Sequence, residues 1–271
     1  MFSLDHPQKS PLFDYYAPIG SHYRGLLSVP HSGENIPKVF AHYLSGDLRA
    51  YKEDVDFKVN ELIDIESLQN AGVAVLVAHV HRICVDLNRA ENNCVLFWKD
   101  NTQGKKLVVK DPTTEETEKF IETFHRPYYE LLKAALQDLE KRKKAPVSMI
   151  DLHSMPSRPT EYHMKQNPNQ KMHRPDFCLS DRKGKTCEPA FIQYFQQELI
   201  NKGHESSLND PYVGGFVTEY VDQFRTNNIQ IEINRAVYMD EITKELVPDK
   251  VAHLRPLLTE VLIKGFTKFD S

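Results

Sequence analysis

The chain has 271 residues, of which 40% are hydrophobic and 27% are charged, and its formal net charge is −4. These values are typical of a globular protein with one large domain, and a chain without a basic excess is poorly suited to bind the phosphate backbone of nucleic acid. No apolar stretch approaches the length that spans a bilayer, and no secretory signal follows Met1. We therefore expect a cytoplasmic protein that binds neither nucleic acid nor membrane; the sequence leaves its oligomeric state open.

The predicted elements begin after residues 1–24, a polar and aromatic segment that is predicted to be an irregular arm. Short apolar runs between polar breaks predict buried strands at residues 26–29, 73–77, 83–87, 146–152 and 229–233. Apolar residues at helical spacing predict helices within residues 36–50 and at 56–68, 188–202 and 247–266, while 211–218 is predicted to be a strand or a tight turn. Strands that alternate with helices predict an α/β fold with a mostly parallel sheet covered on both faces.

The strongest helix signal lies at residues 113–139. Thr113 and Glu116 have the spacing of a capping box, apolar residues follow at i, i+3 and i+4, and Pro127 predicts a kink or a split. Residues 155–187 lack periodicity and are predicted to form a long loop that covers the substrate. We therefore predict a single domain at residues 25–271 with this loop as an insertion.

Four polar clusters each follow or end an apolar run. They are LLSVPHSGE at 26–34, ICVDLNR at 83–89, MIDLHS at 149–154 and IQIEINR at 229–235. In open α/β sheets, ligands bind outside the carboxyl ends of the strands. We therefore expect the four clusters to converge on one rim of the sheet.

Two of the clusters offer ligands for a metal ion. His31 and His153 each lie at the end of a predicted strand, and catalytic zinc sites commonly use three protein ligands from the set His, Asp, Glu and Cys. Two acids compete for the third position, namely Glu34, three residues after His31, and Asp56, at the start of a predicted helix. Asp151 faces the same way as His153 and is a candidate to orient that imidazole.

The other two clusters offer groups for an anionic substrate and for proton transfer. The Asn88-Arg89 pair could hold a carboxylate through a forked guanidinium and an amide, and Arg82 could hold a second one. Glu232 lies within an apolar strand, where desolvation would raise its pKa toward the range of a general base.

These motifs resemble those of the N-formylglutamate amidohydrolase, or N-formylglutamate deformylase, family. The resemblance spans roughly residues 26–241, and the matching motifs occur in the family's order along the chain. They are PHSG at 30–33, DF at 56–57, HRICVDLNR at 81–89, RPYY at 126–129, DLHS at 151–154, PDF at 175–177, VGGFVT at 213–218 and QIEINRAVYMDE at 230–241.

The resemblance implies a three-layer α/β/α fold of the phosphorylase/hydrolase type, similar to zinc carboxypeptidases. It also implies zinc-dependent hydrolysis of a small-molecule N-formyl or N-acyl amino acid such as N-formylglutamate, releasing formate or another acid and the amino acid. The family's pattern implies Asp56 beside His31 and His153 at one zinc ion, whereas the carboxypeptidase pattern favours Glu34.

The remaining matches imply roles around the substrate. Glu232 matches the expected base, Asn88 and Arg89 match the pair that holds the substrate carboxylate, and Arg82 is assigned to catalysis. From the PHSG and VGGFVT motifs, Ser32 and Gly215 join the substrate-binding residues.

The chain also departs from the family. Phe216 stands where formylglutamate enzymes tend to carry His, and the charged run 181–183 replaces small residues. We therefore also consider a hydrolase of other N-acyl amino acids or small peptides, and a non-catalytic module that binds an anionic amino-acid derivative. A Ser- or Cys-dependent hydrolase is less well supported, because the chain has no G-x-S-x-G elbow.

Overall fold

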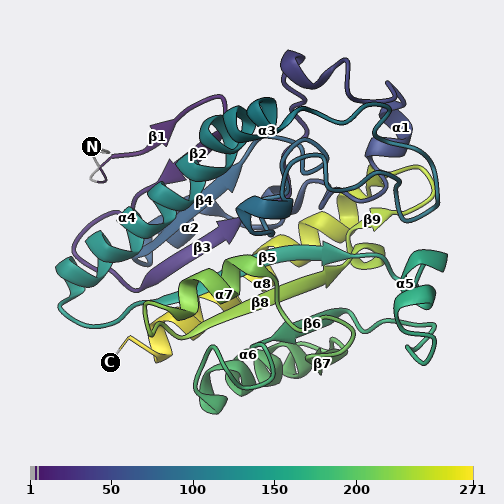
Figure 1. Cartoon of the computed structure of the whole chain (residues 1–271). Helices are drawn as coiled ribbons and strands as arrows, with labels where there is room; N and C mark the ends of the chain where they lie inside the picture. Colours follow the sequence, from purple (N-terminus) through teal and green to yellow (C-terminus); the bar gives the residue numbers. More distant parts are fainter. Residues whose placement is uncertain (1–3, 5, 271) are drawn as a thin grey trace.

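The computed structural model describes residue 4 and residues 6–270, and an eight-stranded sheet is its centre (Figure 1). The strand order is β1-β2-β4-β3-β5-β8-β6-β7. In chain order, the strands are β1 (Gln8–Lys9), β2 (Phe13–Tyr16), β3 (Gly25–Val29), β4 (Val73–Ala78), β5 (Ser148–Met155), β6 (Phe177–Ser180), β7 (Ser206–Leu208) and β8 (Asn228–Asn234). A small antiparallel pair, β9 (Met239–Asp240) and β10 (Glu245–Leu246), lies outside this sheet.

The four central strands β4, β3, β5 and β8 are parallel, while β2 and β6 run antiparallel to their neighbours β4 and β8. The predicted mostly parallel mixed sheet is therefore confirmed. Since the central strands are parallel, their carboxyl ends meet at one edge, where the polar clusters of β3, β5 and β8 come together.

Helices cover both faces of the sheet and give it three layers (Figure 1). One face carries α3 (Thr114–Phe120), α4 (Arg126–Lys143) and α7 (Phe216–Asp222); the other carries α2 (Ile65–Asn70), α6 (Pro189–Asn201) and α8 (Pro248–Lys268). Successive residues of β3 divide between these faces, since Leu26 belongs to the first core and Leu27 to the second. Both are fully buried, which explains why apolar residues occupy both faces of the strand.

The predicted capping box is confirmed, because Thr113 N donates to the Glu116 carboxylate and Glu116 N donates to Thr113 Oγ1. The helix that it starts is split ahead of Pro127. A π-helical turn at Ile121–His125 separates α3 from α4, and Pro127 lies in the first turn of α4, where its missing N–H costs little.

Two sequence predictions about strands were wrong. Residues 83–87 form a buried turn outside the sheet, because their backbone pairs with the segment 94–96 through Asp86 N to Cys94 O and Leu96 N to Cys84 O. The predicted arm at residues 1–24, of which 1–3 and 5 lie outside the described residues, is not wholly irregular. Strand β2 lies within it and joins the sheet beside β4 with Phe13 and Tyr15 buried.

Three further segments are divided differently from the prediction. The segment 56–68 is not one helix: a 3-10 turn at Val59–Leu62 is followed by α2, whose start is capped when Ser67 N donates to Asp64. The segment 155–187 contains α5 (Glu161–Gln166) and strand β6. Within residues 36–50 the structure has a 3-10 turn at Lys38–Phe40 and the start of α1 (Leu48–Tyr51).

The other predicted helices and strands are present with shifted ends. Of residues 211–218, the first five form a loop and the rest begin α7. No helix in the described part of the chain is both long enough and apolar enough to cross a membrane.

Candidate metal centre

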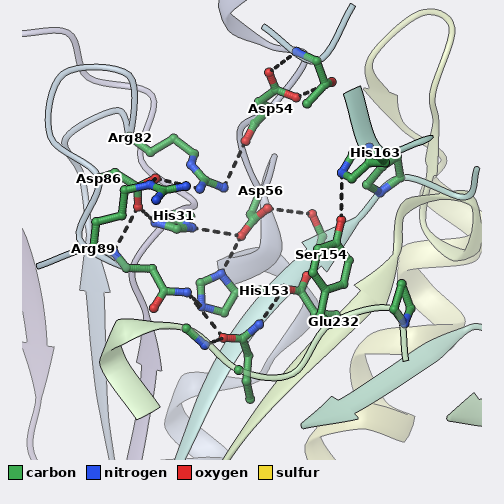
Figure 2. A pocket seen from close by; sticks show the side chains of 18 of the residues that line it. His31, Asp54, Asp56, Arg82, Asp86, Arg89, His153, Ser154, His163 and Glu232 are labelled. Atoms are coloured by element: carbon green, nitrogen blue, oxygen red, sulfur yellow. Dashed lines mark hydrogen bonds and ion pairs between the residues drawn. The ribbon is translucent and has the colours of Figure 1, made fainter. Parts of the chain in front are cut away.

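A cavity of about 410 Å³ opens at the carboxyl edge of the parallel strands (Figure 2). Eight of the ten residues singled out from the sequence line it: His31, Asp56, Arg82, Asn88, Arg89, His153, Gly215 and Glu232. The other two, Ser32 and Glu34, lie elsewhere. They line a separate small cavity, where the Glu34 carboxylate is 3.4 Å from Lys58 Nζ. Ser32 and Glu34 were predicted to lie with the other eight residues, and the structure does not bring them to this cavity.

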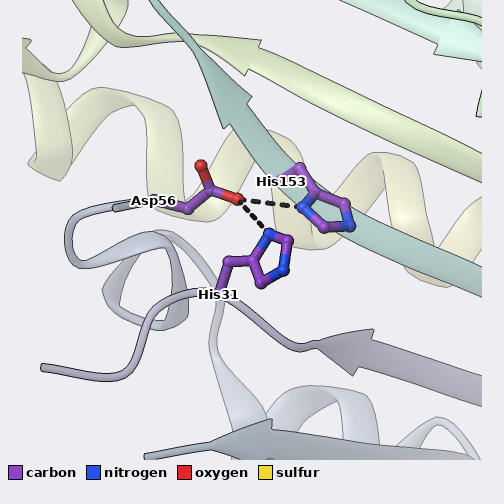
Figure 3. A group of neighbouring side chains, drawn as sticks. All are labelled: His31, Asp56 and His153. Carbon is purple, nitrogen blue, oxygen red and sulfur yellow. Dashed lines mark hydrogen bonds and ion pairs between the residues drawn. The ribbon is translucent and has the colours of Figure 1, made fainter. Parts of the chain in front are cut away.

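His31, Asp56 and His153 form one buried group within this cavity (Figure 3). One nitrogen or oxygen from each lies within 4.8 Å of the others. Asp56 Oδ2 is 2.9 Å from His153 Nδ1 and 3.6 Å from His31 Nδ1. All three are at most 2% exposed, and His31 Nδ1 has no hydrogen-bond partner among the described residues.

Two further carboxylates contact the Nε2 atoms of these imidazoles and orient the rings. His31 Nε2 is 2.7 Å from Asp86 Oδ1, and His153 Nε2 is 2.7 Å from Asp151 Oδ2. A carboxylate at Nε2 keeps the proton on that nitrogen and leaves the Nδ1 lone pair free for a metal ion. In the neutral form of both rings, the two Nδ1 lone pairs face the Asp56 carboxylate, so the donor set of two imidazoles and one carboxylate fits a zinc-type ion.

The neighbouring charges shift the pKa values of His153 and Asp56 in opposite directions. Burial alone would lower the pKa of His153, but Asp151 and Asp56 outweigh it and hold the pKa of this imidazole well above its ordinary value. Burial would raise the pKa of Asp56, but hydrogen bonds with His153 and His31 hold it well below its usual range. Without a metal ion, the centre is therefore an imidazolium between two carboxylates.

Arg235 and Ser154 hold the Asp56 carboxylate in place. Ser154 Oγ donates to Asp56 Oδ1 over 3.2 Å, and Arg235 Nε donates to the same Ser154 Oγ over 3.1 Å. The Arg235 guanidinium also donates to the carbonyls of Glu53 and Val55, which fixes the chain just before Asp56. The sequence analysis did not assign Arg235 a role at the metal centre, although it directly follows the apolar strand that carries Glu232.

Asp86 joins the group of His31, Asp56 and His153 to the cationic side of the cavity. Its Oδ2 accepts from Arg82 Nη2 at 2.8 Å and from Trp98 Nε1 at 2.9 Å, while Oδ1 faces His31. The Arg89 guanidinium lies 3.3 Å from the centroid of the Phe97 ring. Sequence reasoning missed Asp86 and Trp98, since Trp98 lies in a segment without periodicity.

Glu232 lies on the opposite side of the group from Arg82 (Figure 2). Burial raises its pKa to about 7; the charge of His153 opposes this shift and that of Asp56 adds to it. Gln230, two residues earlier on the same face of β8, donates from Nε2 to Glu232 Oε1 at 2.7 Å. Gln230 thus donates to Oε1 of Glu232 and not to Oε2.

Gln230 and Asn88 also fix the turn before α7. Gly215 N donates to Gln230 Oε1 at 2.8 Å, and Val217 N donates to Asn88 Oδ1 at 2.9 Å. A Cβ on Gly215 would lie 2.2 Å from the Asn88 amide, so no side chain fits there. The Asn88 amide, predicted to bind substrate, is therefore partly engaged with the protein.

The residues at which the chain departs from the family's pattern do not line the cavity. Phe216 packs against Tyr129, with ring centroids 5.5 Å apart, and is not among the residues that line the cavity. In the run 181–183, Asp181 accepts from Gly184 N, and Arg182 forms an ion pair with Glu219 at 3.0 Å. Neither departure places a new group beside the metal centre.

The cysteines offer no activated nucleophile. Burial raises the pKa of Cys94 and Cys187 to about 12, and it raises the pKa of Cys84 and Cys178. A thiol with a raised pKa stays protonated at neutral pH and is a poor nucleophile.

Comparisons by family model, by sequence and by structure all find N-formylglutamate amidohydrolases or deformylases. The family model described as N-formylglutamate amidohydrolase matches residues 24–239. The chain is 26% identical to N-formylglutamate deformylase of Pseudomonas putida over 264 residues, which are 90% of this chain and 94% of that protein. The deformylase of Pseudomonas aeruginosa is also 26% identical over 262 residues, with the same coverage. The crystal structure of N-formylglutamate amidohydrolase from Ralstonia eutropha JMP134 has a TM-score of 0.84 at 26% identity, covering 96% of this chain and 98% of that one.

Proposed function

This chain belongs to the N-formylglutamate amidohydrolase family, and from that premise we propose that it is a zinc-dependent hydrolase of N-formyl or N-acyl amino acids such as N-formylglutamate. The products are formate, or another acid, and the free amino acid. The observation that carries the proposal is the buried group of His31, Asp56 and His153, whose Nδ1 atoms face a single carboxylate beside Glu232.

His31, Asp56 and His153 are the residues that would hold the metal ion. A bound divalent ion would polarise the scissile carbonyl and lower the pKa of water toward about 7. Asp86 and Asp151 keep the two imidazoles in the ligating tautomer, and Arg235 and Ser154 hold Asp56.

Glu232 is the proton acceptor. A carboxylate whose pKa lies near the working pH takes a proton from the attacking water and returns it to the leaving amine. Gln230 directs this carboxylate through its bond to Oε1, so that Oε2 is the oxygen available to the water. The net reaction consumes one water for each amide bond that is broken.

Arg89 and Arg82 bind the carboxylates of the substrate. Both guanidinium groups face the cavity beside the metal centre, and Asn88 and Gly215 border the same space. An anion held there places its amide over the metal centre, and this fixed geometry removes much of the entropic barrier to attack.

The test is formate release from N-formylglutamate by the purified protein, measured as isolated, after chelation, and after zinc is added back. We expect turnover to disappear with the chelator and to return with zinc, and Glu232→Gln to abolish turnover while zinc content stays stoichiometric. A non-catalytic binding module would bind the substrate without releasing formate and would not need the metal. Absence of stoichiometric zinc together with absence of turnover would overturn the proposal.

A further inference from the structure

Tyr212, His163 and Arg174 form a connected polar group on the wall of the cavity beyond Glu232. Tyr212 and His163 both line the cavity. Arg174 is buried, and its Nη1 donates to Tyr212 Oη at 3.1 Å. His163 Nε2 is also 3.1 Å from Tyr212 Oη. No sequence pattern predicted a role for these three residues.

The contacts of the other ring nitrogen, Nδ1, show whether His163 donates or accepts in its hydrogen bond with Tyr212. His163 Nδ1 accepts from the backbone N–H of Thr160 at 3.2 Å, so Nδ1 carries no proton. The proton of the imidazole is therefore on Nε2, which donates to Tyr212 Oη. Burial and the charges of Arg174 and Arg235 lower the pKa of His163 to about 4, in agreement with a neutral ring.

The oxygen of Tyr212 thus accepts two N–H donors, and its own proton is not used by either. A phenol oxygen has one proton to donate, and burial raises the pKa of Tyr212 to about 12, so the proton is retained at neutral pH. Among the residues that the structure describes, none is recorded as an acceptor for this proton. The hydroxyl is therefore a positioned donor on the wall of the cavity.

The main chain and the neighbours of Tyr212 are held firmly. Ser180 Oγ donates to the Tyr212 carbonyl at 2.7 Å, and Arg174 is anchored by its bonds to the Pro156 carbonyl and to Gln170 Oε1. A donor that is held before the substrate arrives costs little reorganisation during the reaction, which is the requirement for stabilising a developing charge.

The location of the group indicates which half of the substrate it meets. Figure 2 shows Arg82 and Arg89 on one side of Asp56 and His153, and His163 on the other. If the arginines hold the carboxylates of the amino-acid half, the acyl half extends over the metal centre toward His163 and the hydroxyl bonded to it.

We propose that the Tyr212 hydroxyl donates a hydrogen bond to the acyl oxygen of the substrate, where negative charge develops when water attacks the carbonyl carbon. Tyr212 is then a catalytic residue, and His163 and Arg174 are positioning residues that aim its proton. The hydroxyl keeps its proton throughout and forms no covalent bond. This inference rests on the proposed function, because it requires an N-acyl amino acid in the cavity.

The first test is Tyr212→Phe, which removes the hydroxyl and keeps the ring. Removal of one such donor typically lowers kcat by about 10²-fold or more, and we expect this loss with KM and zinc content nearly unchanged. Tyr220→Phe is the matched control, because Tyr220 packs against Tyr129 and does not line the cavity. Unchanged kcat in Tyr212→Phe, or a raised KM with unchanged kcat, would overturn the inference.

The second test measures binding without turnover. The probe is an H-phosphinate in which HPO₂–CH₂ replaces the formyl–NH group of N-formylglutamate, because its tetrahedral anion imitates the charged acyl centre. Calorimetry should show that Tyr212→Phe weakens this probe by about the factor lost in kcat while glutamate binds equally well. Equal affinity of both proteins for the probe would contradict the inference and leave the proposed function standing. A wild-type protein that neither hydrolyses N-formylglutamate nor binds the probe would overturn the proposed function itself.

Discussion

At the scale of single residues, the centre depends on carboxylates that do not touch the proposed metal ion. Asp86 and Asp151 each accept from the Nε2 of one imidazole and are themselves fully buried. Asp86 is further tied to Arg82 and Trp98, whereas Asp151 accepts from Ser28. The two carboxylates therefore fix both the tautomer and the orientation of the proposed ligands.

Loss of either carboxylate is expected to weaken zinc binding. Replacement of a group that orients a ligating histidine typically lowers metal affinity by about 10–100-fold. We expect this loss for Asp86→Asn and for Asp151→Asn, measured by competition with a chromophoric chelator. Asp111→Asn, which changes an exposed carboxylate paired with Lys99, is the control. Wild-type affinity in both buried variants would show that these carboxylates do not support the site.

The raised pKa of His153 gives a second prediction at this scale. The metal-free protein holds the imidazole protonated at neutral pH, and a ligand nitrogen must lose its proton to bind a metal ion. Zinc binding should therefore release a proton, and zinc affinity should rise as the pH rises toward the raised pKa of His153. Calorimetry in buffers of different ionisation enthalpy counts the released protons. Zinc affinity that does not change between pH 6 and pH 8 would contradict the protonated state.

At the scale of elements, the turn before α7 links the substrate side of the cavity to the base. Gly215 N and Asn88 Nδ2 both donate to Gln230 Oε1, and Gln230 Nε2 in turn donates to Glu232. A change in the turn is therefore transmitted to the carboxylate through a single amide side chain.

Gly215→Ala tests this link. Because the new Cβ would lie 2.2 Å from the Asn88 amide, the turn or Asn88 must shift. Overpacking of this kind costs about 1–3 kcal/mol of stability, and we expect kcat to fall as Gln230 loses its partner. Ile242→Ala, at an exposed position outside this cavity, should leave kcat and the free energy of unfolding unchanged. Wild-type kcat in Gly215→Ala would show that the turn does not position Glu232.

At the scale of the whole molecule, the proposed metal ion would connect three distant parts of the chain. His31 follows β3, Asp56 lies in the segment between β3 and α2, and His153 lies near the end of β5. A ligand that binds only the folded state stabilises it by mass action, by about 4 kcal/mol when its concentration is a thousand times Kd.

Zinc should therefore raise the free energy of unfolding of the wild-type protein, and chelation should lower it. Urea unfolding at several free zinc concentrations measures the effect. His153→Ala should unfold at the same urea concentration with or without zinc. An identical zinc response in this variant would place the stabilising ion elsewhere.

The sequence alone was sufficient for the local features of the fold. The strands β3, β4, β5 and β8, which were predicted from short apolar segments, and the capping box at Thr113 follow from side-chain properties and near neighbours. The run at residues 83–87 misled the prediction, because a buried turn and a buried strand require the same apolar residues. Only its backbone partner at 94–96 distinguishes the two, and that partner is a tertiary contact.

The same distinction applies to the site. The residue types and their places at strand ends indicated His31, His153 and Glu232 as candidates, since parallel strands bring their carboxyl ends to one edge. Arg89 was indicated by a predicted strand at residues 83–87 that is a turn in the structure. Which acid faces the imidazoles was decided by the direction of the chain after each residue, and it brought Asp56 rather than Glu34 to them. The roles proposed for Asp86, Arg235 and Tyr212 depend on contacts between segments far apart in the chain. Such contacts leave no spacing pattern in a single sequence, because folding alone brings their partners together.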